Sequence, residues 1–108
     1  MKRFHVRLSA EAEQDLIDIY RYIAYHDSVE SAGHVLDQLE TVCSRLTGFP
    51  QRGHIPPELE WIAVTNFREL NFKPWRIIYE VIHRDVFIHC ILDGRRDMLA
   101  LLERRLLR

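Results

Sequence analysis

The stretch that decides the fold is WRIIYEVIHRDVFIHCILDGRRD, which spans Trp75–Asp97. Two runs of mainly β-branched and aromatic residues, Trp75–Ile82 and Val86–Leu92, flank a three-residue polar link. Runs of this length and chemistry, joined by a short polar link, are typical of a β-hairpin. Arg76 falls within the first run, and alternate residues of a strand share a face. One face of the hairpin therefore carries an arginine, and we expect that face to be the functional one.

The N-terminal half of the chain predicts one strand followed by two helices. Lys2–Leu8 alternates apolar and charged residues, as a half-buried strand does. Ser9 and Ser28 are suited to cap two helices, because a serine hydroxyl can accept a hydrogen bond from the first turn. Apolar residues recur at helical spacing over Ala10–Tyr25, and again from position 29 until Gly48 ends the second helix. Since the link is short, the two helices should form an antiparallel hairpin.

The C-terminal half predicts a loop, three strands and a final helix. Gln51–Glu60 contains one glycine and two prolines and is predicted to be a loop. Trp61–Leu70 is predicted to be a strand, and Asn71–Pro74 turns the chain into the hairpin. After Gly94, closely spaced leucines predict a helix. The expected fold is a single α+β domain over residues 1–108. It contains a strand, a helix hairpin, a three-stranded antiparallel meander and a C-terminal helix, with the helices packed on one face of the sheet.

The composition is that of one ordinary globular domain. The chain has 108 residues, of which 47% are apolar and 29% charged, so it can bury one modest core. No run approaches the ~18 apolar residues of a transmembrane helix, and the N-terminus lacks the apolar core of a secretory signal. Cys43 and Cys90 lie in apolar runs without ligand spacing, and the six histidines are scattered. We therefore expect free buried thiols, a cytoplasmic location, no membrane partner, and neither a metal nor another cofactor.

The net charge of −1 conceals a separation of charge along the chain. Between Ser9 and Glu40 there are eight acidic residues and one basic residue. Between Asp93 and Arg108 there are five arginines and three acidic residues. Positive potential therefore gathers at the C-terminal end, where an anionic or acidic partner would be attracted. Two solvated helix faces of opposite sign would give the same pattern, so charge alone does not identify a partner.

Ten short pieces occur in a fixed order along most of the chain: LSAEA at 8–12, DL at 15–16, IY at 19–20, YIA at 22–24, Leu46, FP at 49–50, RG at 52–53, FREL at 67–70, WRIIYEV at 75–81 and ILDGRRD at 91–97. Together these pieces resemble the RelE/ParE toxins of bacterial type II toxin–antitoxin modules. The resemblance implies the α+β fold described above and a cognate antitoxin, whose C-terminal segment wraps the toxin and whose N-terminal domain binds DNA. The toxin would then reach DNA only indirectly, through the antitoxin. RelE-like members cut mRNA in the ribosomal A site, whereas ParE-like members poison DNA gyrase without being nucleases.

The residues supply only half of a RelE-like nuclease site. Metal-independent RNA cleavage requires charge stabilisation at the phosphate and groups that move protons. Arg76 and Arg96 match two arginines of RelE-like nucleases, and guanidinium groups suit the first task. After the second arginine those enzymes carry a tyrosine or histidine, whereas here Met98–Leu107 is aliphatic and charged. The proton-transfer half is therefore missing from this part of the sequence.

Glu69 is the other residue to weigh in a nuclease site. It stands where a lysine of RelE would help to hold RNA, and it could act as a base with Asp93 as the acid. Its neighbour Arg68 would favour the ionised form, so a structural ion pair between them, which could include Arg76, is the simpler interpretation. If the chain is a nuclease, its catalytic residues would be Arg76, Arg96 and Glu69. We otherwise assign no catalytic residue.

The balance of these residues favours a ParE-like inhibitor of DNA gyrase. A protein that binds ribosomal RNA usually carries a basic surface, whereas the first two helices of this chain are strongly acidic. We predict that Arg76, Asp93, Arg95 and Arg96 bind the target. In a purely structural interpretation, Arg95 or Arg96 pairs with Asp93 or Asp97 to fix the last helix. The alternatives are a ribosome-dependent mRNA interferase, with the ribosome and mRNA as partners, and a degenerate member that is not toxic.

The antitoxin is expected to bind apolar faces of the helices. An amphipathic segment of a partner can lie in an apolar groove between helices or along one helix. Most leucines of this chain should nevertheless be ordinary core residues. The predicted antitoxin-binding residues are Leu16, Ile23, Leu36, Leu39, Leu102 and Leu106.

Overall fold

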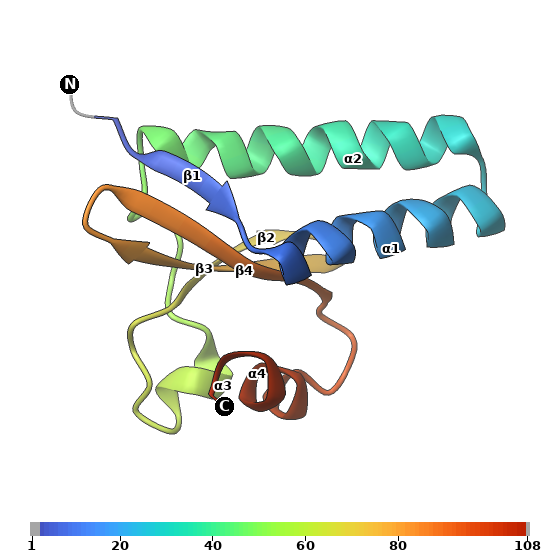
Figure 1. The fold of residues 1–108 in the computed structure, drawn as a ribbon. Helices are drawn as coiled ribbons and strands as arrows, with labels where there is room; N and C mark the ends of the chain where they lie inside the picture. The colour runs from blue at the N-terminus through green and yellow to red at the C-terminus, as the bar shows by residue number, and fades with distance from the viewer. Residues whose placement is uncertain (1–2, 108) are drawn as a thin grey trace.

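Residues 3–107 are described by the computed structural model, and they form a four-stranded sheet with helices on both faces (Figure 1). The order of the main elements is the one that the sequence predicts, so the α+β fold class is confirmed. A 3₁₀ turn at Arg45–Thr47 follows the second helix. The elements are β1 (His5–Leu8), α1 (Ala10–His26), α2 (Val29–Ser44), α3 (Pro57–Glu60), β2 (Arg68–Phe72), β3 (Trp75–Ile82), β4 (Asp85–Asp93) and α4 (Met98–Leu106).

The strands lie side by side in the order β1-β4-β3-β2. β2, β3 and β4 form the antiparallel meander that the sequence predicts. β1 joins the other side of β4 in parallel, with His5 opposite Asp85 and Leu8 opposite Ile88. The predicted first strand included Lys2, which lies outside the described residues. The helix hairpin and the segment from residue 45 to residue 67 thus carry the chain from one edge strand of the sheet, β1, to the other, β2.

The segment before the meander differs from the prediction. The sequence predicts a strand over Trp61–Leu70, whereas only Arg68–Phe72 is paired with β3. Part of the predicted loop Gln51–Glu60 is helical instead and forms α3. The strand prediction fails because Ala63 has a φ of 62°, a left-handed conformation that a continuous strand does not contain.

Local hydrogen bonds begin the helices where the sequence predicts. The Ser9 hydroxyl accepts a hydrogen bond from the Ala12 amide, and the Ser28 hydroxyl accepts one from the Ser31 amide. The Asp97 carboxylate likewise accepts one from the first turn of α4. The three serine and aspartate caps therefore fix the start of each long helix.

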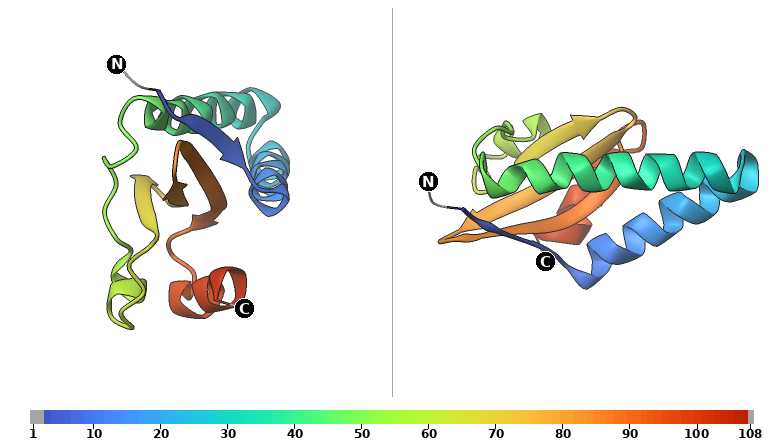
Figure 2. Two further views of the ribbon diagram at one scale, coloured as in Figure 1. Left: turned by 60° about the vertical axis from the view of Figure 1, so that its left-hand side comes forward. Right: turned by 90° about the horizontal axis from the view of Figure 1, so that it is seen from above.

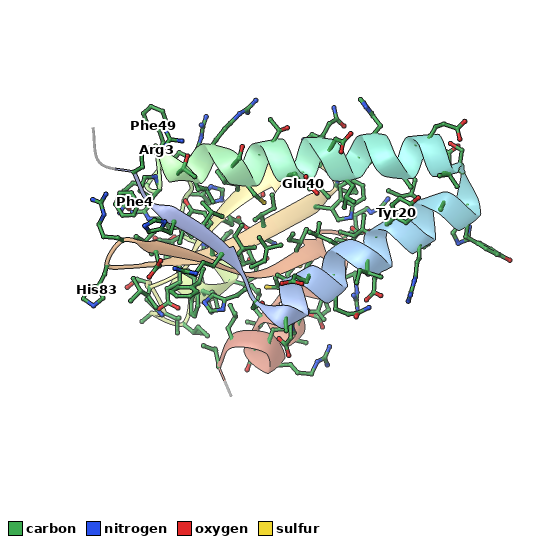
Figure 3. All side chains as sticks on the ribbon, turned by 45° about the horizontal axis from the view of Figure 1, so that its top comes forward. Arg3, Phe4, Tyr20, Glu40, Phe49 and His83 are labelled. Atoms are coloured by element: carbon green, nitrogen blue, oxygen red, sulfur yellow. The ribbon has the colours of Figure 1, made fainter. Side chains whose placement is uncertain are left out.

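The first hydrophobic core lies between the α1–α2 hairpin and one face of the sheet. Apolar side chains fill this space, whereas His83 at the tip of the β3–β4 hairpin points away from the sheet (Figure 3). Tyr79 is the largest of the fully buried side chains. The buried residues of this core are Ala12, Leu39, Cys43, Leu46, Ile77, Tyr79, Val86, Ile88 and Ile91.

A second core lies on the opposite face of the sheet, beneath α3 and α4 (Figure 2). The sequence places all helices on one face, which is correct for α1 and α2 and wrong for α4. The reason is that Ile78, Cys90 and Leu92 make the second face apolar as well, and an apolar face must be covered. The buried residues of this core are Leu59, Phe67, Ile78, Cys90, Leu92, Met98, Leu101 and Leu102.

The two cysteines belong to different cores. Cys43 and Cys90 are free and buried, as predicted. Burial raises the pKa of Cys43 to about 11 and that of Cys90 to about 12, because an apolar surrounding disfavours the thiolate. Among the helices of residues 3–107, none is long and apolar enough to cross a membrane.

Candidate functional site

Arg76 lies at the centre of a buried ion network between β3, β2 and α3. Its side chain is only 15% exposed. Nη1 and Nη2 donate to the two carboxylate oxygens of Glu58 on α3, at 2.8 and 2.6 Å. Nε donates to Oε1 of Glu69 on β2, at 2.6 Å. The hydrogen bonds between Glu58 and Arg76 lower the pKa of Glu58 and raise that of Arg76, so this pair is ionised at neutral pH.

Glu69 is held from a second side by His54. The Glu69 side chain is 3% exposed, and its Oε2 lies 2.7 Å from Nε2 of His54. The backbones of the two residues also exchange hydrogen bonds, at 2.7 and 3.1 Å. Two carboxylates and one guanidinium give this network a net charge of −1 while His54 is neutral. The cluster is therefore not a positive site, although an arginine lies at its centre.

The loop that carries His54 is fixed by Tyr79. The buried tyrosine hydroxyl donates to the Pro50 carbonyl at 2.9 Å and accepts from the Gly53 amide at 3.0 Å. A Cβ atom at position 53 would lie 2.5 Å from the Glu69 carbonyl oxygen and 2.6 Å from the tyrosine hydroxyl oxygen. Only glycine fits between these groups, so Gly53 and Tyr79 together set the position of His54.

The expected pair between Arg68 and Glu69 does not form. Arg68 instead donates to the carbonyl oxygens of Gly53 and Gln51, at 2.7 and 3.4 Å. Neighbouring residues of a strand point to opposite faces, so Arg68 and Glu69 cannot meet on the same face of β2. The sequence correctly suggests that Glu69 has a structural partner and that Arg76 takes part, but it names the wrong arginine as the main one.

The arginines after β4 differ in how they are held. Arg95 is 74% exposed, and its Nε and Nη2 donate to the two carboxylate oxygens of Asp93, at 2.9 and 2.7 Å. The hydrogen bonds from Arg95 lower the pKa of Asp93. Within residues 3–107, the side chain of Arg96 makes no hydrogen bond or ion pair, and it is exposed. Of the four predicted target-binding residues, Arg96 is thus the one whose charge is not already engaged.

The turn after β4 lies directly against the turn between β2 and β3. The Gly94 amide donates to the Pro74 carbonyl at 2.8 Å, and a Cβ atom on Gly94 would lie 2.8 Å from Cδ of Arg76. A cleft of about 550 Å³ opens beside these turns, and a groove of about 470 Å³ runs between the same turns and α1. Trp75 and Arg95 line both the cleft and the groove. The cleft also contains His54, Glu69, Lys73 and Arg76, and the groove also contains Ile19, Tyr22, Ile23 and Arg96.

The predicted antitoxin-binding residues do not form one surface. Leu39 and Leu102 have no exposed surface and belong to the two cores. Leu39 nevertheless lines the floor of a groove between β1 and α2. Leu16 and Leu36 line one groove between α1 and α2, of about 420 Å³. Ile23 lies in the groove beside Arg96, and Leu106 packs on the second core across the sheet. Helical periodicity identifies the apolar face of each helix, but it does not separate core leucines from groove leucines.

Sequence reasoning misses two residues of this network, Glu58 and His54. His54 is a lone histidine in a loop and lies far along the chain from the arginines that it accompanies. A glycine before it and a buried tyrosine that binds that glycine bring it to Glu69. A single sequence gives no signal for this pairing, because the contact crosses elements. Among residues 3–107, no group of three or more histidine, cysteine, aspartate or glutamate side chains is placed to hold a metal.

Comparison with known proteins places this architecture in one family. The family model described as the ParE toxin of the type II toxin–antitoxin system, parDE, matches residues 6–98. Toxin ParE3 of Caulobacter vibrioides is 32% identical over 91 residues, which cover 84% of this chain and 87% of that protein.

Two solved structures share the fold. The chromosomal ParDE system from P. aeruginosa has a TM-score of 0.69 at 19% identity, over 82% of this chain and 92% of that chain. The RelBE2 toxin–antitoxin complex from Mycobacterium tuberculosis has a TM-score of 0.63 at 16% identity, over 86% and 93%. The structures support the fold, and the family model and the curated relative give the family. The chain belongs to the ParE toxin family of type II toxin–antitoxin systems.

Proposed function

We propose that this chain inhibits DNA gyrase and that a cognate antitoxin neutralises it. The observation that carries the choice of target is the state of Arg76. In the nuclease alternative, this arginine must bind the phosphate that is cleaved. Here all three of its nitrogen atoms already donate to Glu58 or Glu69. The guanidinium charge is therefore not available for a phosphate oxygen.

The electrostatics of the cluster lead to the same conclusion. The carboxylates of Glu58 and Glu69 both form ion pairs with Arg76, and Glu69 is almost completely buried. A phosphodiester that approaches this cluster meets an excess of one negative charge unless His54 is protonated. Opposite charges within hydrogen-bonding distance stabilise each other strongly in a partly buried site, so neither glutamate should yield Arg76 to a substrate. The cluster is better suited to holding α3 in place than to stabilising a pentavalent phosphate.

One observation favours the nuclease as a second candidate. His54 is paired with a buried carboxylate, which is how general bases and acids are often oriented in enzymes. It opens onto the cleft that contains Arg76 and Lys73. The His54–Glu69 pair would supply the proton-transfer group that Met98–Leu107 lacks. A nuclease site here would still lack an available cation, because Arg76 is already engaged, and for this reason we rank the nuclease second.

The proposed contact with gyrase is centred on Arg96, with Arg95 beside it. Arg96 is exposed and unengaged among the described residues, whereas Asp93 holds Arg95 in a fixed orientation. The sequence predicts that Arg76 and Asp93 bind the target themselves. The contacts favour an indirect role for both, in which Arg76 fixes α3 and Asp93 orients Arg95.

The antitoxin is proposed to bind along β1 and the adjacent helices. β1 is an edge strand, and no strand among residues 3–107 pairs with its outer side. Val6, Leu8 and Leu16 line an apolar groove of about 240 Å³ between this edge and α2. An extended segment can add a strand to such an edge and place alternate side chains in the groove. The fold-sharing toxins from P. aeruginosa and M. tuberculosis belong to toxin–antitoxin systems, which supports an antitoxin as the occupant.

The test of the proposed target uses purified chain and two reactions. In the first, gyrase supercoils relaxed plasmid in the presence of increasing concentrations of the chain, with and without the cognate antitoxin. In the second, translating ribosomes are incubated with the chain and the mRNA is examined for new ends. We expect loss of supercoiling that the antitoxin reverses, and intact mRNA. Normal supercoiling together with cleaved mRNA would show that the second candidate is correct.

A further inference from the structure

The loop after α3 lies on the far side of the sheet from α2 (Figure 1). This loop contains an exposed tryptophan. Trp61 is 88% exposed and its neighbour Ile62 is 41% exposed. Tryptophan is highly buried on average in folded proteins, because its large apolar surface is unfavourable in water. A tryptophan this exposed, beside an exposed isoleucine, therefore requires an explanation.

The backbone around Trp61 is tightly ordered by hydrogen bonds. The Val64 amide donates to the Leu59 carbonyl at 2.9 Å, and the Ala63 amide donates to the Glu60 carbonyl at 3.0 Å. This pair of bonds is the Schellman arrangement that ends many helices. The left-handed residue in that arrangement is usually glycine, whereas here it is Ala63, with a φ of 62°. Alanine adopts this conformation less readily than glycine, so the surrounding hydrogen bonds must hold Ala63 in it.

The base of the same loop is anchored in the body of the protein. Leu59 has no exposed surface and lies in the second core. One residue before it, Glu58 makes its two hydrogen bonds to Arg76. α3 is only four residues long, so these two contacts fix the direction in which the following loop projects. The buried ion network thereby determines where Trp61 is presented.

We propose that Trp61 and Ile62 form an anchor that inserts into an apolar pocket of the protein that this toxin inhibits. This inference rests on the proposed function, in which that protein is gyrase. A rigidly held, exposed tryptophan loses little conformational freedom on binding and buries a large area, which is why tryptophan is enriched at binding hot spots. Backbone strain at an exposed loop is also typical of functional sites, where the surrounding structure enforces it.

The position of Trp61 and Ile62 favours the inhibited protein as their binding partner over the antitoxin or a membrane. Their loop lies across the sheet from β1 and from the groove between β1 and α2, where we place the antitoxin (Figure 2). A toxin can therefore present Trp61 without competing for that groove. An anionic membrane surface is a poor occupant, because the exposed carboxylate of Glu60 precedes Trp61 directly.

The test compares Trp61→Ala with Tyr25→Ala in the gyrase supercoiling assay. Tyr25 is a matched control, since it is an aromatic residue that is 86% exposed and lies at the end of α1, in the helix hairpin. Trp61→Ala should raise the concentration of chain needed for half-inhibition by at least about tenfold, as expected for truncation of a hot-spot tryptophan. Tyr25→Ala should change it by less than about twofold, and Trp61→Phe should retain part of the inhibition. Neither alanine variant should alter the unfolding midpoint or the affinity for the antitoxin.

Different failures lead to different conclusions. If the unaltered chain inhibits gyrase and Trp61→Ala inhibits it equally well, the anchor is wrong and the proposed target stands. If the unaltered chain does not inhibit gyrase, the proposed function fails, and this inference fails with it. If Trp61→Ala converts a self-associated chain into a monomer in sedimentation, a second copy occupies the anchor and the assignment to the target is wrong.

Discussion

Glu58 and Arg76 lie eighteen positions apart in the sequence and are joined by two hydrogen bonds, of 2.6 and 2.8 Å. Glu69 binds the remaining nitrogen of the same guanidinium at 2.6 Å. This relationship has two consequences. It removes from the surface a positive charge that a nuclease of this superfamily would need, and it fixes α3 and the loop that carries Trp61. The contact between Glu58 and Arg76 therefore disfavours the nuclease, and it fixes the loop that we propose binds the target.

Arg76→Ala should be severely destabilising. It leaves Glu58 partly buried and Glu69 almost fully buried without their cation. Removing one partner of a buried ion pair typically costs ~3–5 kcal/mol, because the remaining charge stays desolvated. Urea unfolding followed by circular dichroism gives the free energy of unfolding. A loss below 1 kcal/mol would mean that Arg76 is not the structural centre that we describe.

Glu58→Gln should destabilise the chain moderately and loosen α3. Glutamine keeps one hydrogen bond to Arg76 but removes the charge, so we expect a loss of ~1–2 kcal/mol in the free energy of unfolding. Glu60→Gln is the matched control: it lies two positions away, is exposed, and should change stability by less than ~0.5 kcal/mol. Equal effects of the two substitutions would contradict a specific role for Glu58.

Arg96→Ala should abolish inhibition of the target and leave the fold unchanged. The side chain is exposed and, within residues 3–107, unpaired, so the free energy of unfolding should change by less than ~0.5 kcal/mol. Antitoxin affinity should stay within ~1 kcal/mol, as for a charge at the rim of an interface. Arg104→Ala, an exposed arginine on α4, serves as the control and should keep its inhibitory activity. Unfolding of Arg96→Ala alone would show instead that Arg96 is structural.

The acid stability of the chain should depend on Glu58. Its hydrogen bonds to Arg76 lower its pKa in the folded state below the ordinary value of about 4.3 for glutamate. The unfolded chain therefore binds more protons as the pH falls below that value, and the stability contributed by the pair is lost through the folded pKa. Urea midpoints measured between pH 7 and pH 3 should fall less steeply for Glu58→Gln than for the unaltered chain. Parallel curves would contradict the assignment.

Gly53→Ala should be destabilising, whereas Gly33→Ala should not. The added methyl group at position 53 meets the Glu69 backbone at 2.5 Å and the Tyr79 hydroxyl at 2.6 Å, and the backbone cannot move without breaking the hydrogen bonds of His54. We expect a loss of ~1–3 kcal/mol, as for other overpacked sites. Gly33 lies within α2 with no atom within 4 Å of an added Cβ, so alanine there should stabilise by up to ~1 kcal/mol. Thermal unfolding of both variants distinguishes the two effects.

Local signals in the sequence predict most of the fold. The β3–β4 hairpin follows from its β-branched runs, and the starts of α1 and α2 follow from Ser9 and Ser28, because caps and strand patterns depend on neighbouring residues. The side of the sheet on which α4 packs could not be predicted. It depends on Ile78 and Cys90 together making the second face apolar, which is a property of two paired strands.

The site was less predictable than the fold. The sequence identifies Arg76 and Glu69 as important but cannot show which charges they meet. Glu58 comes from a segment that the sequence predicts to be a loop, and His54 reaches Glu69 only because Tyr79 holds the preceding glycine. Contacts between helices and strands decide whether an arginine is available to a ligand. Such contacts cannot be predicted from a single sequence.

The most direct test of the central claim is the supercoiling of relaxed plasmid by gyrase in the presence of the purified chain. Because Arg76 is already bound by two carboxylates, we expect the chain to act as a gyrase inhibitor and not as a nuclease. Supercoiling should fall as the chain is added and recover when the antitoxin is present. Undiminished supercoiling at a large molar excess of folded chain would contradict the proposed function.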